Sequence, residues 1–174
     1  MKAVADACKS AGVPIRVGVN SGSLEREILA KYGSPTPEAL VESAMTHAAI
    51  LEHFDFNDIV ISIKSSDVNK LIQSYRLAAE KCSYPLHLGV TEAGTLIPGA
   101  VRNSVALGIL LSEGIGDTIR VSLTAKPEKE VKVGLEILRS LGLRAPGPAI
   151  TSCPTCGRTK VDLFRIASQV EDAL

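Results

Sequence analysis

The sequence predicts an α/β protein that forms the C-terminal half of a (β/α)8 barrel, followed by the start of a second domain. Four strand-like segments alternate with helical segments, and such repeated units require parallel strands joined by helical crossovers. A linker rich in Pro and Gly, Arg144-Ala-Pro-Gly-Pro148, separates these units from the Cys-x-x-Cys pair Cys153 and Cys156. We therefore expect a barrel portion at 1–145 and a second domain beginning at 146–174.

The composition is that of a globular protein with one aliphatic core. Of 174 residues, 45% are hydrophobic and 22% are charged. Lys+Arg and Asp+Glu number 19 each, and aromatics make up 3% with no Trp, so neither nucleic acid nor an anionic membrane is an expected partner. No apolar run reaches the roughly 20 residues of a membrane span. Four cysteines, two of them isolated, indicate a reducing, cytoplasmic setting rather than a disulfide framework.

Local signals mark the elements of the first part of the chain. A helix is expected over 2–11, ending at Gly12, because glycine readily adopts the left-handed conformation that ends a helix. Strict alternation of apolar and polar residues over 15–20 indicates the first strand, and a short helix is expected over 24–31. The run Thr36-Pro37-Glu38 is typical of a helix start, with a hydroxyl cap, an early proline and an acidic first turn.

Three further strand–helix units follow. Strands are expected over 58–64, 86–91 and 118–123. Asp67 is the expected cap of the helix after the second strand, and Pro127 opens the helix after the fourth. A loop over 93–99 and a helix ending near Ser112 lie between the third and fourth strands, and a final helix is expected over 160–174.

The polarity of the strands favours a barrel over an open sheet. An open sheet covered by helices on both sides has two apolar faces. Here one face is apolar: Ile15, Val17, Val19, Ile59, Ile61, Ile63, Leu86, Leu88, Val90, Ile119, Val121 and Leu123. The other carries polar residues and glycines: Arg16, Gly18, Asn20, Val60, Ser62, Lys64, His87, Gly89, Thr91, Arg120 and Ser122. The polar face suits the interior of a barrel, and four units are half of eight.

The carboxyl ends of barrel strands are the usual place for an active site. The candidate residues there are Asn20, Lys64, Thr91, Glu92 and Ser122, with Arg16, His87 and Arg120 one step deeper. Three cations facing one interior would repel one another unless an anion joins them. Guanidinium forks and an ammonium group suit phosphate oxygens, so a diphosphate is the expected ligand. Alternatively, each cation pairs with a carboxylate of the barrel.

Glu92 follows the third strand and is the candidate general acid or base. The alternative is a carboxylate that merely anchors Lys64 or an arginine. His87 lies deeper, and the sequence is equally compatible with a core histidine and with a residue of the site.

The Cys153–Cys156 pair has several interpretations. A thioredoxin-like dithiol usually has proline directly before the second cysteine, whereas Pro154 follows the first. A zinc ribbon would contain the knuckle Cys-Pro-Thr-Cys-Gly but needs two more ligands, and Cys8 and Cys82 are expected in helix cores. An iron–sulfur site needs further ligands as well. The pair itself decides among none of these.

A series of motifs in order resembles one enzyme family. These motifs are Ile15-Arg-Val-Gly-Val-Asn-Ser-Gly-Ser23, Tyr32-Gly33 with Thr36-Pro37, Lys64-Ser-Ser-Asp67, Leu86-His-Leu-Gly-Val-Thr-Glu-Ala-Gly94, Leu111-Ser-Glu-Gly-Ile-Gly-Asp117, Arg120-Val-Ser-Leu123 and Ser152-Cys-Pro-Thr-Cys-Gly-Arg158. Together they resemble the 4-hydroxy-3-methylbut-2-enyl diphosphate synthases, the iron–sulfur enzymes of the non-mevalonate isoprenoid pathway. The resemblance covers essentially the whole chain.

The resemblance implies a cytoplasmic bacterial oxidoreductase with a TIM barrel and an α+β iron–sulfur domain. Its reaction would be the reductive ring opening and dehydration of 2-C-methyl-D-erythritol 2,4-cyclodiphosphate. The implied cofactor is a 4Fe–4S cluster fed by flavodoxin or ferredoxin, and the implied assembly is a homodimer. By motif, the residues that would bind the diphosphate are Arg16, Asn20, Lys64, Arg120 and Ser122. Thr91 would lie close to the substrate, and Glu92 would handle a proton. Cys153 and Cys156 would ligate the cluster.

Relative to that family, the chain is expected to lack the first half of the barrel and the later cysteine and glutamate that complete the cluster. By itself it is therefore expected neither to hold an intact cluster nor to turn over. Two other functions stay open on the sequence. One is a non-catalytic half barrel that binds phosphate and carries a zinc knuckle; the other is an oligomerising scaffold without a ligand.

Overall fold

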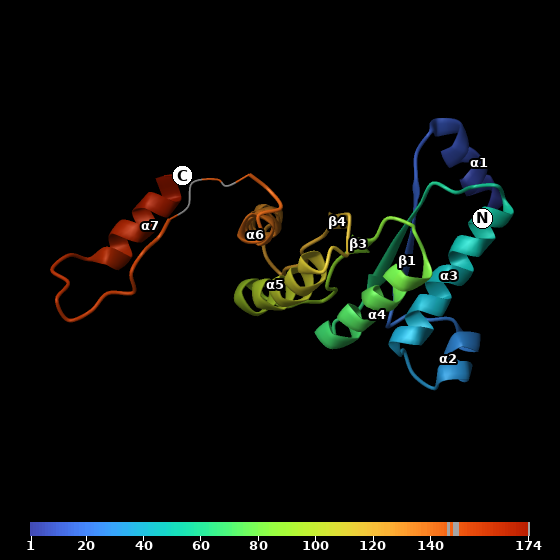
Figure 1. Cartoon of the computed structure of the whole chain (residues 1–174), viewed down its shortest axis with the longest axis horizontal. Coiled ribbons are helices and arrows are strands. Elements are labelled where there is room, and N and C mark those ends of the chain that lie inside the picture. Colours follow the sequence, from blue (N-terminus) through green and yellow to red (C-terminus); the bar gives the residue numbers. More distant parts are fainter. Residues whose placement is uncertain (146, 148–149, 174) are drawn as a thin grey trace.

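The computed structural model describes residues 1–145, 147 and 150–173 (Figure 1). Its elements, in chain order, are α1 (Lys2–Ala11), β1 (Ile15–Asn20), α2 (Arg26–Tyr32), α3 (Pro37–His53), β2 (Ile59–Lys64), α4 (Val68–Lys81), β3 (His87–Leu88), α5 (Leu96–Ser112), β4 (Thr118–Ile119), α6 (Pro127–Ser140) and α7 (Leu163–Ala173). Among these residues, no helix combines the length and the apolar character that crossing a bilayer requires.

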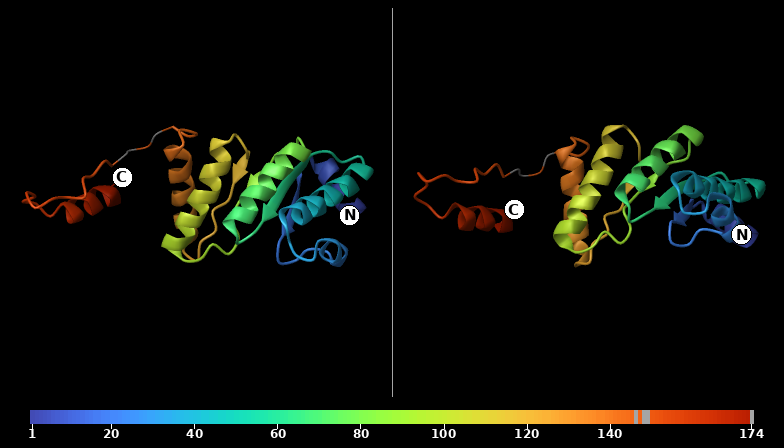
Figure 2. Two further views of the ribbon diagram at one scale, coloured as in Figure 1. Left: turned by 60° about the horizontal axis from the view of Figure 1, so that its bottom comes forward. Right: turned by 90° about the horizontal axis from the view of Figure 1, so that it is seen from below.

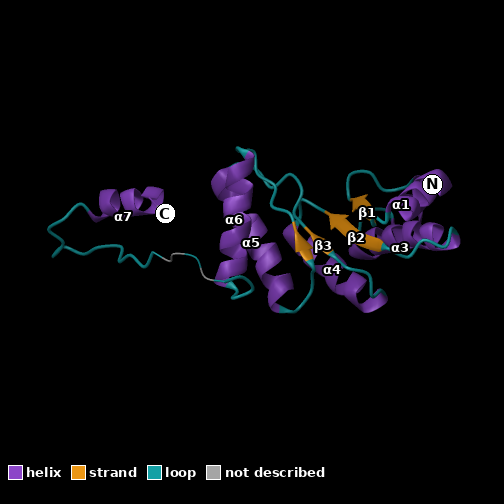
Figure 3. Ribbon diagram, turned by 90° about the horizontal axis from the view of Figure 1, so that it is seen from above, coloured by secondary structure: helices purple, strands orange, loops and turns teal. Residues whose placement is uncertain are grey.

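The four strands are parallel and follow one another in space in chain order. β1 pairs with β2 from Ile15–Ile59 to Asn20–Lys64. A single bridge between Ile61 and Leu86 joins β2 to the third strand segment, and His87 pairs with Thr118 where β3 meets β4. Figure 3 shows β1, β2 and β3 side by side. The predicted α/β class with parallel strands is confirmed.

The last two strands are shorter than the predicted 86–91 and 118–123, because their later backbone groups bond elsewhere. The Leu123 N–H donates to the Glu130 carboxylate at 2.7 Å, and the Thr124 N–H donates to the Gly94 carbonyl at 2.9 Å. At Gly89, a Cβ atom would lie 2.9 Å from the Arg120 carbonyl oxygen. Only a glycine therefore allows the segments after β3 and β4 to approach so closely. Beyond Leu88, loops and side chains therefore replace the regular ladder.

The predicted helix starts are largely confirmed. The Ala39 N–H donates to the Thr36 hydroxyl at 3.2 Å, and the Lys70 N–H donates to the Asp67 carboxylate at 3.0 Å. The expected loop over 93–99 is shorter, since α5 already begins at Leu96. Pro98 is compatible with that start because the first N–H groups of a helix have no intrahelical acceptor.

The core lies between the apolar face of the strands and the helices. Helices α3, α4, α5 and α6 succeed one another along the sheet (Figure 2). The most deeply buried strand residues, each at most 2% exposed, are Ile59, Ile61, Ile63, Leu88 and Val90. Helices cover one face of the sheet only, which leaves the predicted polar face open to ligands.

The C-terminal part differs from its prediction. The short apolar run before Cys153 predicts a strand, but none is formed at Ile150 and Thr151, and Ala149 lies outside the described residues. α7 begins at Leu163 rather than at 160. The helical spacing of its apolar residues predicts a buried face, but these residues are between 41% and 74% exposed: Val161, Phe164, Ile166 and Val170. A strand without a partner strand, and an apolar helix face without a partner surface, gain nothing from burial here.

Candidate anion-binding site

A small pocket lies on the polar face of the sheet. Its walls come from the end of β2, from β3 and the residues after it, and from the segment after β4. The lining residues are Ser62, Lys64, His87, Gly89, Val90, Thr91 and Arg120. Of the predicted site residues, Lys64, Thr91 and Arg120 therefore line one pocket.

Arg16 belongs to the same charged environment. Burial lowers the pKa of His87, and the positive charges of Arg16, Lys64 and Arg120 lower it further. These three cations come from β1, β2 and the segment after β4, and all act on one imidazole of β3. Arg16, Lys64 and Arg120 are thus near enough to act on one imidazole, and their joint binding of an anion stays a prediction.

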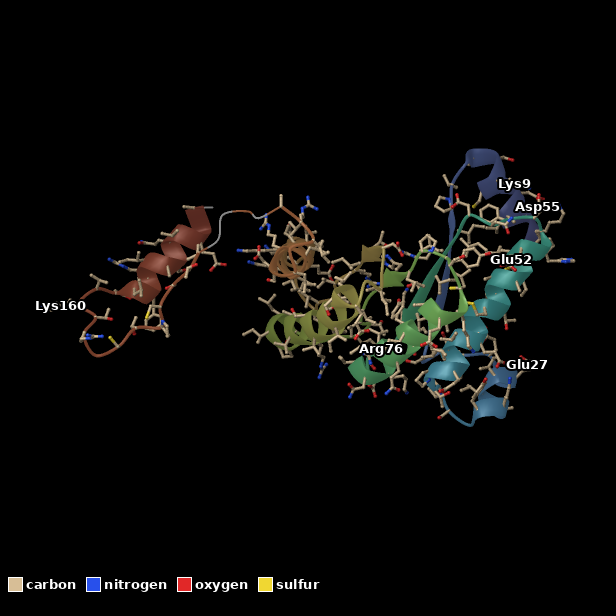
Figure 4. All side chains as sticks on the ribbon, viewed as in Figure 1. Lys9, Glu27, Glu52, Asp55, Arg76 and Lys160 are labelled. Atoms are coloured by element: carbon tan, nitrogen blue, oxygen red, sulfur yellow. The ribbon has the colours of Figure 1, made fainter. Side chains whose placement is uncertain are left out.

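The pocket cations are not paired with carboxylates among the described side chains, a property they share with several surface cations. Some surface cations do have carboxylate partners, such as Lys9 with Asp55 at 2.5 Å (Figure 4) and Arg76 with Glu113. Among the side chains described, no carboxylate lies within ion-pair distance of Arg16, Lys64 or Arg120. The alternative in which barrel carboxylates neutralise these cations has no support in this part of the chain.

Asn20 lies next to Lys64 at the carboxyl ends of β1 and β2. The two residues are paired in the parallel register, and the Ser21 N–H donates to the Lys64 carbonyl at 3.0 Å. The Asn20 side-chain oxygen accepts a hydrogen bond from the Gly22 N–H at 3.1 Å. Asn20 therefore shapes the loop after β1, and its amide N–H groups are not used in that bond.

Glu92 does not line the pocket; it is exposed and has a left-handed backbone with φ of 53°. This conformation costs a residue with a Cβ roughly 1–2 kcal/mol. Neighbouring bonds maintain it: the Thr91 N–H donates to the Ser65 carbonyl at 3.2 Å, and the Ala93 carbonyl accepts from Arg102 at 2.9 Å. Such over-determined strain is typical of functional loops.

Ser122 is half-buried at the end of the fourth strand segment and does not line the pocket. Its carbonyl accepts a hydrogen bond from the Asn103 side chain at 3.3 Å. Asn103 is fully buried, and its amide also donates to the Gly99 carbonyl at 2.8 Å. Sequence reasoning missed Asn103, Arg102 and Glu130, although a lone amide within the apolar pattern of α5 was a detectable signal for the first.

Cys153 and Cys156 lie far along the chain from the pocket, and both thiols are exposed and unlinked. The Thr159 N–H donates to the Cys156 carbonyl at 3.0 Å, and Thr155 between the cysteines has φ of 75°, so the segment folds back on itself. Hydrogen bonds from the Arg158 backbone and then its guanidinium lower the pKa of Cys156. Within the described ranges, no three His, Cys, Asp or Glu side chains are grouped for a metal. The chain offers two thiol ligands.

Consecutive parallel strands with helices packed along one face define an α/β protein of the barrel type. The comparison with protein families agrees: this chain belongs to the family described as the GcpE TIM-barrel domain, whose model matches residues 1–135. The family resemblance expected from the sequence motifs is confirmed.

Several curated proteins are similar to the chain over almost its whole length. A protein of Clostridium perfringens is 59% identical over 174 residues, which is 100% of this chain and 50% of that protein. A protein of Maridesulfovibrio salexigens is 60% identical over 171 residues, 98% of this chain and 48% of that protein. Both are named 4-hydroxy-3-methylbut-2-en-1-yl diphosphate synthase (flavodoxin). The chain spans about half the length of these relatives.

Proposed function

We propose that the chain contributes a substrate-binding half barrel and two cluster cysteines to a 4-hydroxy-3-methylbut-2-enyl diphosphate synthase. The enzyme would reductively open the ring of 2-C-methyl-D-erythritol 2,4-cyclodiphosphate and release water. The observation that carries this proposal is the convergence of Arg16, Lys64 and Arg120 on His87 without a neutralising carboxylate among the described residues. A diphosphate supplies the missing negative charge.

Two features of the sheet support the half barrel: the order of its strands and the open groove beside β4. Strand order β1 to β4 is that of successive barrel strands, and β4 ends the order. Beyond it lies an open groove with mainly apolar walls between β4 and α6, lined by Ile119, Arg120, Val121, Glu130, Val131, Gly134, Leu135 and Leu138. A further strand–helix unit would cover this groove. We propose a domain boundary near 145, after α6; the family match to residues 1–135 lies within the first of these two parts.

In the proposed reaction, the positive groups and the hydroxyl and amide groups at the strand ends bind the cyclic diphosphate. Arg16, Lys64 and Arg120 balance its charge, while Asn20 and Ser122 add neutral hydrogen bonds. Thr91 lies between Lys64 and the Glu92 loop and contacts the substrate from that side. Glu92 holds or moves the proton that leaves with the hydroxyl group as water. Its exposed carboxylate follows Thr91, which lines the pocket, and this supports a role beside the substrate.

Cys153 and Cys156 would be two ligands of a 4Fe–4S cluster. Their donor chemistry fits, because cluster iron is bound by thiolates and the lowered pKa of Cys156 favours that form. When bound, the cluster would supply electrons for the reduction. The two relatives are named for flavodoxin, which we propose as the electron donor, with ferredoxin as the alternative. A zinc knuckle at the same two thiols is the competing function.

We further propose a homodimer in the bacterial cytoplasm. The outer face of α5 supports self-association, since it exposes an apolar row at four-residue spacing: Ile97, Val101, Val105 and Ile109. Ile97 is 76% exposed, and a second copy would cover such a row. Analytical ultracentrifugation of Ile97→Glu against the native protein tests this assembly. An unchanged sedimentation coefficient would exclude this face as the interface.

The cluster is tested with the full-length protein purified without oxygen. We expect iron and sulfide, a broad visible absorption, and turnover of the cyclodiphosphate with reduced flavodoxin. Cys153→Ser should remove the absorption and the turnover, whereas the control Cys82→Ser, in a half-buried thiol packed on the core, should retain both. Stoichiometric zinc without iron would refute the redox function and favour the knuckle.

The pocket is tested by binding, independently of the cluster. Removing one charge-assisted contact costs about 1.5–3 kcal/mol, so Lys64→Ala and Arg120→Ala should each weaken inorganic pyrophosphate binding about tenfold or more. Lys129→Ala, an exposed cation of α6, is the matched control and should bind as the native protein does. Equal affinity in all four proteins would favour a scaffold without a ligand.

A further inference from the structure

His87 has an unusual place in the pocket, because one of its two ring nitrogens has no partner. Nδ1 lies 2.7 Å from the Thr118 hydroxyl oxygen, across the β3–β4 pair. Nε2 is shielded from solvent, and among the described residues it makes no hydrogen bond. A buried polar nitrogen without a partner is costly, and at a binding site it indicates a group reserved for a ligand-dependent bond.

The charged groups around the ring are nearly all positive. Arg16 approaches from β1, Lys64 from β2 and Arg120 from the segment after β4. On the helix side, the Tyr75 hydroxyl of α4 bonds to the backbone carbonyl of His87, not to its ring. Asp117, directly before β4, accepts a hydrogen bond from the Leu86 N–H at 2.8 Å.

This environment opposes a fourth positive charge as long as the pocket holds no anion. An anion between the cations shifts the balance, because its negative charge attracts a proton to the ring. Binding and protonation are then linked, and each must strengthen the other by the same factor. The three cations thereby convert a core-like histidine into a sensor of the occupant of the pocket.

We propose that His87 is a further ligand-binding residue, which takes up a proton when an oxyanion such as a diphosphate binds beside Lys64 and Arg120. The ligand then meets four positive charges in place of three. In the tautomer whose Nδ1–H donates to the Thr118 hydroxyl, the added proton goes to Nε2. The new N–H can donate to the ligand, which satisfies the nitrogen that is otherwise without a partner in the described structure. This inference rests on the proposed function and adds a residue and a proton to it.

The experiment is calorimetry of inorganic pyrophosphate binding to the full-length protein in buffers that differ in ionisation enthalpy. The native protein should take up more protons per ligand than His87→Gln, and the difference isolates His87 from the titration of pyrophosphate itself. Sulfate, which does not titrate near neutral pH, is the second probe. His53→Gln, in an exposed histidine at the end of α3, is the control and should behave as the native protein does.

The affinity for sulfate should also fall as the pH rises. Protonated His87 favours the anion, so sulfate should bind more tightly at about pH 5 than at about pH 8, by up to about tenfold, the limit for one pKa unit of coupling. His87→Gln should flatten this dependence. If His87→Gln does not fold, ring-nitrogen NMR of the native protein gives the same answer, since sulfate should move the His87 titration to higher pH.

The outcomes separate the two ideas. Binding of both anions with no difference in proton uptake between the native protein and His87→Gln overturns the inference and leaves the proposed function standing. Absence of any binding by the native protein overturns the anion site itself, and with it both proposals.

Discussion

The Tyr75 hydroxyl group lies 2.5 Å from the backbone carbonyl oxygen of His87 and 2.8 Å from that of Ile63. It also accepts a hydrogen bond from the Ile63 N–H at 3.0 Å. Burial raises the pKa of Tyr75, so the group remains a donor throughout the physiological range. One side chain of α4 therefore joins β2 to β3 directly beneath the residues that line the pocket.

Tyr75→Phe should destabilise the protein by about 1–3 kcal/mol, because it leaves buried backbone groups without a partner. Urea unfolding followed by circular dichroism measures this. Tyr84→Phe is the matched control: its hydroxyl bonds to Glu52 at the surface, and its loss should change stability by less than about 0.5 kcal/mol. Equal effects of the two substitutions would contradict the bridging role of Tyr75.

Glu92→Gly should stabilise the fold and abolish function. Glycine relieves the left-handed backbone strain, with an expected gain of about 1 kcal/mol. Loss of the proton-handling carboxylate should lower turnover by about a hundredfold or more. Thermal melts and cyclodiphosphate turnover of the full-length protein measure the two effects.

Asp55 provides the control for Glu92. It also has a left-handed backbone, with φ of 55°, but it pairs with Lys9 at a surface away from the pocket (Figure 4). Asp55→Gly should leave turnover unchanged. Full activity of Glu92→Gly would show that the carboxylate has no part in the reaction.

Glu130→Ala should destabilise the end of the fourth strand segment. Its carboxylate accepts from the Leu123 N–H at 2.7 Å, and without it a half-buried donor loses its partner, at about 1–3 kcal/mol. The neighbouring Glu128 is exposed in the same first turn of α6, so Glu128→Ala separates this bond from the general preference of helix starts for acids. Hydrogen exchange of the Leu123 amide should accelerate only in Glu130→Ala.

Cys156 should react with iodoacetamide at lower pH than an ordinary thiol. Its pKa is lowered chiefly by the Arg158 backbone N–H and then by the guanidinium, so the thiolate persists as the pH falls. Arg158→Ala removes only the second contribution and should move the alkylation midpoint part of the way upward. Mass spectrometry of the metal-free protein measures it, with Lys160→Ala as a control of similar charge. Identical midpoints in all three proteins would exclude a specific Arg158 contact.

Much of the fold follows from local chemistry. The caps at Thr36 and Asp67, the glycine end of α1 and the alternation in β1 and β2 were all predictable, since each depends on residues within a few positions. The polar face was predictable as well, because side chains alternate across a strand whatever lies beyond it. The sequence alone thus placed Lys64, Thr91 and Arg120 near one another.

The tertiary structure decided where backbone groups bond across long distances. Glu130 and Gly94 take the N–H groups of Leu123 and Thr124 and so end the fourth strand early, which no local pattern reveals. The orphan nitrogen of His87 and the strained backbone of Glu92 likewise arise only when separate strands and α5 come together. Periodicity reports which face of an element is apolar, but competition among distant donors and acceptors depends on geometry. That competition determined the shape of the pocket and the residues that line it.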